Sequence, residues 1–160
     1  MIPINTPKGT FRVWTKRVGN NPRIKVLLLH GGPSVTHEYY DAFDSFFPAA
    51  GIEYYYDQLG SFYSDQPNEP DLWELPRFVE EVEQVRQALG LNRDNFYLLG
   101  SSWATATCGH RGTRRTGVRA CERVCDRGAL SSVAGALSRD ARSNESDRRS
   151  SATVLIRRLK

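Results

Sequence analysis

A serine within a short run of small residues is the first feature with catalytic potential. The motif Gly100-x-Ser102-x-Ala104 directly follows an apolar run at residues 95–99. A serine on a sharp turn between a strand and a helix has its hydroxyl held above the sheet, and the crowded turn requires small neighbours. The spacing therefore predicts a nucleophilic Ser102, although an ordinary polar turn has the same pattern. Glycine usually ends this motif, and Ala104 is the smallest departure from it.

A second motif, His30-Gly31-Gly32-Pro33, follows another apolar run at residues 25–29. Glycines in such a loop allow backbone N–H groups to approach a substrate oxyanion and so supply half of an oxyanion hole. The other half is the N–H of the residue after the nucleophile, which is Trp103 here. A plain Gly-Pro turn is the alternative. Two such motifs in this order, each after an apolar run, are more specific than either alone.

Hydrophobic patterning predicts the elements that position these loops. Residues 10–18 alternate between polar and apolar types, which indicates a half-exposed strand. The continuous apolar run at 25–29 is typical of a strand buried on both faces, and the segments at 52–56 and 95–99 are predicted to be further buried strands. Residues 39–47 are rich in aromatic side chains and are expected to be helical.

The clearest predicted helix spans residues 75–89, where apolar side chains recur at spacings of three and four. Pro76 suits the first turn and Gly90 a C-terminal stop. Glu80 and Glu81 are expected on the polar face.

Buried strands that alternate with helices predict an α/β fold, with a mostly parallel sheet covered by helices on both faces. In such sheets ligands bind at the carboxyl ends of the strands. The three unusual loops, at residues 30–34, 57–64 and 100–104, all follow such ends. We therefore expect them to form one site.

Residues 1–103 resemble the proline iminopeptidase family of serine aminopeptidases, which have the α/β-hydrolase fold. The family's HGGPG is HGGPS at residues 30–34, and its D-Q-x-G-x-x-x-S segment lies at residues 57–64. Its G-x-S-W-G-G motif matches through Trp103, after which Ala104-Thr105 replaces Gly-Gly. The resemblance implies that residues 1–103 are the N-terminal part of an α/β-hydrolase fold, which extends as far as the turn that carries the nucleophile.

The resemblance also implies an activity: release of an N-terminal residue, typically proline, from a peptide substrate. Ser102 would attack the scissile carbonyl, and backbone N–H groups near Gly32 and Trp103 would hold the oxyanion. A histidine beside such a loop more often orients backbone than transfers protons. No metal or organic cofactor is implied. The residues expected to shape the loops around the site are His30, Gly31, Pro33, Asp57, Gln58 and Gly60.

The acid and base of the family's triad lie far downstream of the serine, and no residue here is marked as either. His110 lies eight residues after Ser102, on a helix expected to run away from it. Three later carboxylates are available but unmarked: Asp126, Asp140 and Asp147. We therefore expect a truncated, inactive form of the enzyme.

Composition changes at the residue where the resemblance ends. Residues 1–103 hold all the aromatic residues and carry a net charge of −4, whereas residues 104–160 carry +8, with 12 arginines. So few large apolar side chains with so much charge predict a disordered basic tail. This composition, rich in Arg, Ser, Ala, Gly and Thr, is also that of a GC-rich gene read out of frame. We therefore hypothesise that residues 104–160 are a frameshifted or mis-predicted segment.

Other functional classes have weaker support. Cys108, His110, Cys121 and Cys125 lack a Cys-x2-Cys pair, so no zinc site is expected. The arginines predict only weak, salt-sensitive binding of nucleic acid. The alternatives are therefore a non-catalytic protein whose basic tail binds anionic partners, or another serine hydrolase such as an esterase.

No apolar run is long enough to span a membrane, and the first residues lack the apolar stretch of a signal peptide. Residues 1–103 also lack cysteine, so a cytoplasmic protein is expected. Its oligomeric state is not predicted.

Overall fold

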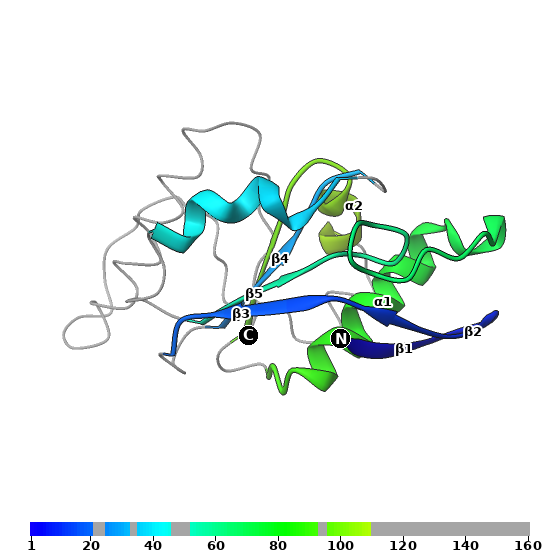
Figure 1. Ribbon diagram of the computed structural model, residues 1–160, viewed down its shortest axis with the longest axis horizontal. Helices are drawn as coiled ribbons and strands as arrows, with labels where there is room; N and C mark the ends of the chain where they lie inside the picture. Colours follow the sequence, from blue (N-terminus) through cyan, green and yellow to red (C-terminus); the bar gives the residue numbers. More distant parts are fainter. Residues whose placement is uncertain (21–24, 33–34, 46–51, 93–95, 110–160) are drawn as a thin grey trace.

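The computed structural model describes residues 1–20, 25–32, 35–45, 52–92 and 96–109 (Figure 1). Residues 110–160 lie outside the described residues, and with them most of the expected basic tail. The strands are β1 (Ile2–Thr6), β2 (Gly9–Val13), β3 (Thr15–Val18), β4 (Lys25–Leu29), β5 (Ile52–Tyr56) and β6 (Phe96–Gly100). The helices are α1 (Leu75–Ala88) and α2 (Ala104–Gly109), with 3-10 helices η1 (His37–Ser45) and η2 (Pro70–Leu72).

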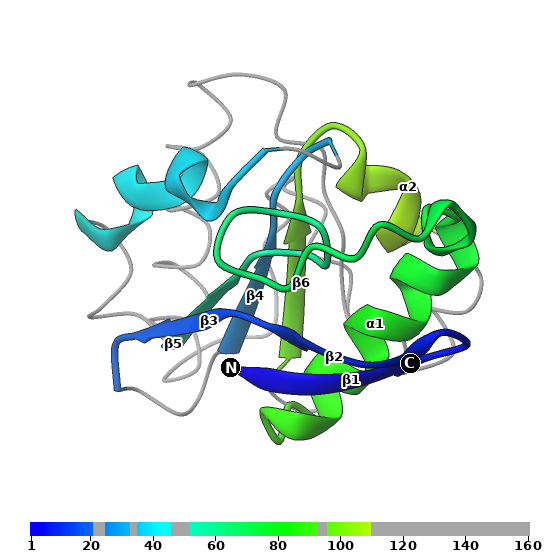
Figure 2. The same ribbon diagram turned by 45° about the vertical axis from the view of Figure 1, so that its right-hand side comes forward.

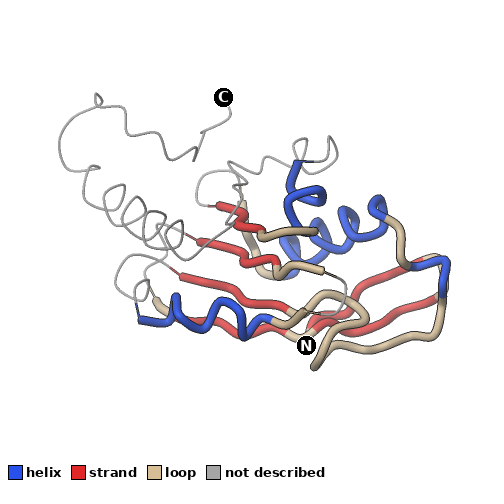
Figure 3. The backbone as a smooth tube through the Cα atoms, turned by 90° about the horizontal axis from the view of Figure 1, so that it is seen from above, coloured by secondary structure: helices blue, strands red, loops and turns tan. Residues whose placement is uncertain are grey.

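Four strands form the main sheet in the order β3-β5-β4-β6 and lie side by side in Figure 3. Strands β5, β4 and β6 run parallel, while β3 is antiparallel to β5. Leu29 at the end of β4 lies opposite Tyr56 of β5 and Gly100 of β6. The predicted mostly parallel sheet is therefore confirmed, and its three parallel strands end at one edge.

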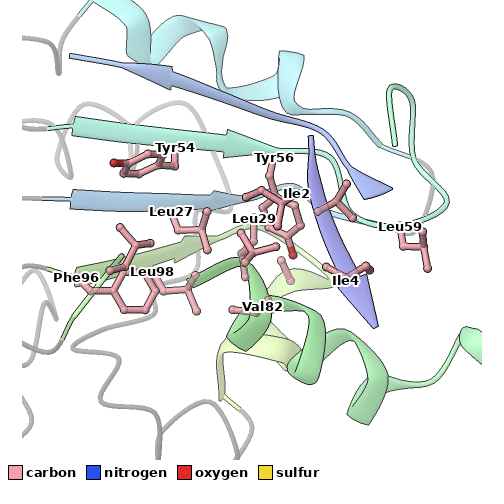
Figure 4. Packing of buried hydrophobic residues seen from close by; sticks show 14 of the residues in the cluster. Ile2, Ile4, Leu27, Leu29, Tyr54, Tyr56, Leu59, Val82, Phe96 and Leu98 are labelled. Atoms are coloured by element: carbon pink, nitrogen blue, oxygen red, sulfur yellow. The ribbon is translucent and has the colours of Figure 1, made fainter. Parts of the chain in front are cut away.

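Helices cover both faces of this sheet, as the continuous apolar runs required. Leu27 and Leu29 share one buried cluster with Val82 and Val85 of α1, and Figure 4 shows these elements packed together. Side chains alternate between the two faces of a strand, so Tyr55 of β5 points away from the face on which Tyr54 and Tyr56 join the cluster. Its hydroxyl donates to the backbone oxygen of Tyr40 in η1 (3.4 Å). Figure 2 shows η1 on one side of the strands, with α1 and α2 on the other.

The sequence predicts a single strand at residues 10–18, and this prediction is wrong in one respect. The segment forms two strands, β2 and β3, which belong to different sheets. The break falls at Trp14. The N–H of Trp14 donates to the Ser64 hydroxyl (2.9 Å), and its carbonyl accepts from the Asp57 N–H (3.2 Å). The loop after β5 therefore forms the hydrogen bonds to the Trp14 backbone that a neighbouring strand would otherwise form. Strand β1, which was not predicted, pairs with β2 as an antiparallel hairpin.

The other predicted elements agree with the structure in type and differ at their ends. The runs at 25–29 and 52–56 are β4 and β5, and the run at 95–99 is β6, which is described from Phe96 to Gly100 because residue 95 lies outside the described residues. The helix expected at residues 39–47 is the 3-10 helix η1, and residues 46–47 lie outside the described residues. Helix α1 ends at Ala88, and Gly90 adopts the left-handed φ of +61° that a C-terminal stop requires.

One expectation about helix α1 is contradicted. Glu81 was placed on the polar face, but only 1% of it is exposed. Its carboxylate is buried because it binds two groups in the interior: the N–H of Leu59 and the guanidinium of Arg77. Glu80, the preceding residue, is exposed as expected.

Candidate active site

Three loops meet at the carboxyl edge of the parallel strands. His30, Asp57 and Ser101 each directly follow one of the paired residues Leu29, Tyr56 and Gly100. The Ser101 N–H donates to the Leu29 carbonyl (3.3 Å), which ties the third loop to the first. The structure thus brings the predicted loops together.

Ser102 sits on a strained turn between β6 and α2. Its φ is +53°, in a region that residues other than glycine rarely adopt and that costs on the order of 1–3 kcal/mol. The Ala104 N–H closes the turn onto the Ser101 carbonyl (3.0 Å), and helix α2 begins there. Ser102 itself is exposed, unlike its neighbours Ser101 and Ala104. A serine on such a turn has its hydroxyl held above the sheet.

Gly31 packs directly against this serine. A Cβ atom at position 31 would lie 3.0 Å from Ser102 Cβ and 3.2 Å from the Ser101 carbonyl oxygen. Any side chain at position 31 would therefore press on Ser101 and Ser102, and glycine avoids this crowding. Gly32 follows with a φ of +49°, and Pro33 lies outside the described residues.

His30 is fully buried and its ring is held at both nitrogens. Its Nε2 accepts the Gln58 N–H (2.9 Å), so Nδ1 carries the proton and donates to the Gly31 carbonyl (3.0 Å). The Gln58 side-chain amide donates back to the His30 carbonyl (2.8 Å). Burial lowers the pKa of His30 and keeps the ring neutral. This arrangement favours an orienting role for His30.

Asp57 is also fully buried and anchors the second loop. Its Oδ1 accepts from the His37 N–H (2.9 Å) and lies 2.9 Å from His37 Nδ1. The His37 ring stacks on Trp14 with centroids 4.2 Å apart. Sequence reasoning missed His37, because no motif links it to an aspartate twenty residues away.

Aromatic side chains also pack against the loops that follow β5 and β6. Gly60 has a φ of +85°, and a Cβ there would lie 2.5 Å from the Trp73 ring. Trp103 meets the Phe78 ring of α1 edge-on, with centroids 6.0 Å apart. The residue after Ser102 is therefore packed against the same helix that carries Glu81.

Within the described part of the chain, no group of three His, Cys, Asp or Glu side chains could hold a metal ion. Of the cysteine-rich set considered for zinc, only the backbone of Cys108 falls inside that part. No helix there is both long and apolar enough to cross a membrane.

A mostly parallel sheet covered on both faces, with a serine at positive φ between a strand and a helix, defines the α/β-hydrolase class of proteins. The family model for the alpha/beta hydrolase fold matches residues 25–110, and the chain belongs to this family. That match includes helix α2 and extends beyond residue 103.

Individual proteins with similar sequences or structures include several proline iminopeptidases. The chain is 64% identical over 104 residues to the proline iminopeptidases of Elizabethkingia meningoseptica and Flavobacterium johnsoniae, which covers 64% of this chain and 35% of each relative. It therefore spans about a third of their length. Its structure is similar to that of the Mycobacterium smegmatis proline iminopeptidase, with a TM-score of 0.63 and 26% identity over 84% of this chain and 48% of that one.

Proposed function

We propose that this chain carries the nucleophile and the oxyanion hole of a serine aminopeptidase that releases N-terminal proline from peptides. The observation that carries the proposal is the exposed Ser102 at positive φ with Gly31 packed against it. The names of the similar proteins support the peptide substrate.

In the proposed reaction, Ser102 Oγ attacks the carbonyl carbon of the first residue of the peptide. The N–H groups of Gly32 and Trp103 stabilise the negative charge that develops on the carbonyl oxygen. The C–N bond then breaks, and the amine of the shortened peptide leaves with the proton that Oγ has lost. Water hydrolyses the acyl-enzyme and releases the free amino acid.

We propose that neither of the two histidines in the described residues is the proton acceptor for Ser102. His30 uses both ring nitrogens to hold Gln58 and Gly31. His37 holds Nδ1 against Asp57, and its ring lies among Trp14 and Phe62 beside the loop that follows β5. We propose that the acid and base belong to the part of the fold that the relatives have beyond the matched third.

The test is a graft in which residues 1–104 of this chain replace the matching third of the Elizabethkingia meningoseptica enzyme. Hydrolysis of proline p-nitroanilide is measured for the graft and for its Ser102→Ala and Ser101→Ala variants. We expect an active graft, a loss of about 10³-fold or more in kcat for Ser102→Ala, and a much smaller loss for Ser101→Ala.

A folded graft that is inactive, or that stays active without Ser102, would contradict the proposal. A graft that cleaves p-nitrophenyl butyrate but not proline p-nitroanilide would favour the esterase alternative. The unaltered 160-residue chain is assayed in parallel, and we expect no turnover because the proposed acid and base lie in the part of the relatives that this chain does not match.

A further inference from the structure

Helix α1 carries a buried carboxylate that the proposed reaction does not use. Glu81 is 1% exposed, whereas the adjacent Glu80 is exposed. A buried carboxylate is costly unless charged or polar groups compensate it, so its partners indicate what it holds in place.

The two oxygens of Glu81 bind different elements. Oε1 accepts the backbone N–H of Leu59 at 3.0 Å, and Oε2 pairs with the guanidinium of Arg77 one turn earlier in α1. Burial raises the pKa of Glu81, while Arg77 and the Leu59 N–H act against that rise. Arg77 is itself fixed, since its Nε donates to the Leu72 carbonyl at 2.7 Å.

A continuous series of contacts leads from Leu59 to the nucleophile. Leu59 follows Gln58, whose N–H and side-chain amide both bind His30, at 2.9 and 2.8 Å. The His30 ring in turn holds the Gly31 carbonyl at 3.0 Å, and Gly31 packs against Ser102. Each of these groups is buried except Ser102.

The same turn of α1 also contacts the other side of the site. The Arg77 guanidinium lies 3.7 Å from the centroid of the Phe78 ring, and Phe78 meets Trp103 edge-on. One helical turn therefore contacts Trp103 directly, through Phe78, and reaches the Gly31–Gly32 loop only indirectly, through the loop that holds Leu59.

We propose that Glu81 is a positioning residue that fixes the oxyanion loop through Leu59, Gln58 and His30. The contacts from Glu81 to Gly31 are present in the structure, and their importance for catalysis rests on the proposed function. Arg77 favours the charged form of the Glu81 carboxylate and binds Oε2, while Oε1 accepts the Leu59 N–H.

The test compares Glu81→Gln with Glu80→Gln in the full 160-residue chain by NMR. Both variants remove one negative charge from α1, but only the first removes a buried one. In Glu81→Gln the amide oxygen faces Arg77, which leaves an NH2 group against the Leu59 N–H. We expect hydrogen exchange at Leu59 and Gln58 to accelerate by about tenfold or more. The His30 pKa should return toward its ordinary value, and the Gly32 and Trp103 amide signals should shift.

Unchanged signals at His30, Gly32 and Trp103 in a folded Glu81→Gln protein would overturn the proposal, as would equal changes in Glu80→Gln. If Glu81→Gln does not fold, Glu81→Asp takes its place, because it keeps the charge for Arg77 but falls short of Leu59. The same readouts apply to it. These measurements do not use the Ser102 hydroxyl, so they can fail independently of the graft experiment.

Discussion

His30 and Glu81 are both buried ionisable residues, yet burial moves their pKa values in opposite directions. The pKa of His30 falls below 6.5 and that of Glu81 rises above 4.5, in each case mainly because burial disfavours the charged form. Each shift makes the stability of the fold depend on pH, with opposite sign.

As the pH falls below 6.5, the unfolded chain protonates His30 before the folded chain does. His30 therefore lowers the free energy of unfolding between pH 6.5 and its depressed pKa. Glu81 has the reverse effect, because the folded chain takes up its proton first. It raises the free energy of unfolding as the pH falls from its elevated pKa to 4.5.

Urea unfolding of the wild type, His30→Gln and Glu81→Gln from about pH 7.5 to about pH 4.5 checks both signs. The stability advantage of the wild type over His30→Gln should shrink with acidification, and its advantage over Glu81→Gln should grow. Parallel curves for all three proteins would show that neither group titrates as its burial implies.

Among single residues, the sequence predicted the site residues that lie in motifs and missed those whose role depends on tertiary contacts. Ser102 and Gly31 occur in recognisable runs of residues, and the structure places them in contact. Glu81 looked like one more acidic residue of an amphipathic helix. Its burial depends on Arg77 and on the Leu59 N–H of a distant loop, and no local pattern reports that contact.

Among the elements, the β1–β2 hairpin is held to helix α1 by a side chain that acts like a neighbouring strand. The Gln84 amide accepts the Asn5 N–H at 2.7 Å and donates to the Asn5 carbonyl at 2.9 Å. It therefore satisfies both backbone groups of one β1 residue across 79 positions of sequence.

Gln84→Ala should lower the free energy of unfolding by about 1–2 kcal/mol, because two hydrogen bonds are lost at a partly exposed site. Gln87→Ala on the same helix is the control, because the Gln87 side chain bonds to Glu83 within α1, and this variant should cost less than about 0.5 kcal/mol. Urea denaturation measures both. Equal losses would mean that the bridge to Asn5 contributes nothing specific.

The elements show the same division between local and distant causes. Strands β4 and β5 were predictable because residues 25–29 and 52–56 are rich in the large apolar and aromatic side chains that a covered sheet requires. The break at Trp14 was not, because the Ser64 hydroxyl that accepts its N–H lies fifty residues away.

For the molecule as a whole, the net charge of +4 conceals an unequal distribution. Residues 1–103, which contain the candidate site, carry −4, and residues 104–160 carry +8 with no aromatic residue. Arginine without aromatic side chains attracts phosphates but offers no surface on which bases stack.

The chain should therefore bind DNA only electrostatically. If it contacts six to ten phosphates, its apparent affinity should fall by about 10³-fold or more between about 50 and about 200 mM NaCl. Electrophoretic shifts with two duplexes of unrelated sequence measure this, and both should bind equally. Binding that survives the higher salt, or that prefers one duplex, would contradict this prediction. It would instead favour a non-catalytic role in which the basic part of the chain recognises an anionic partner.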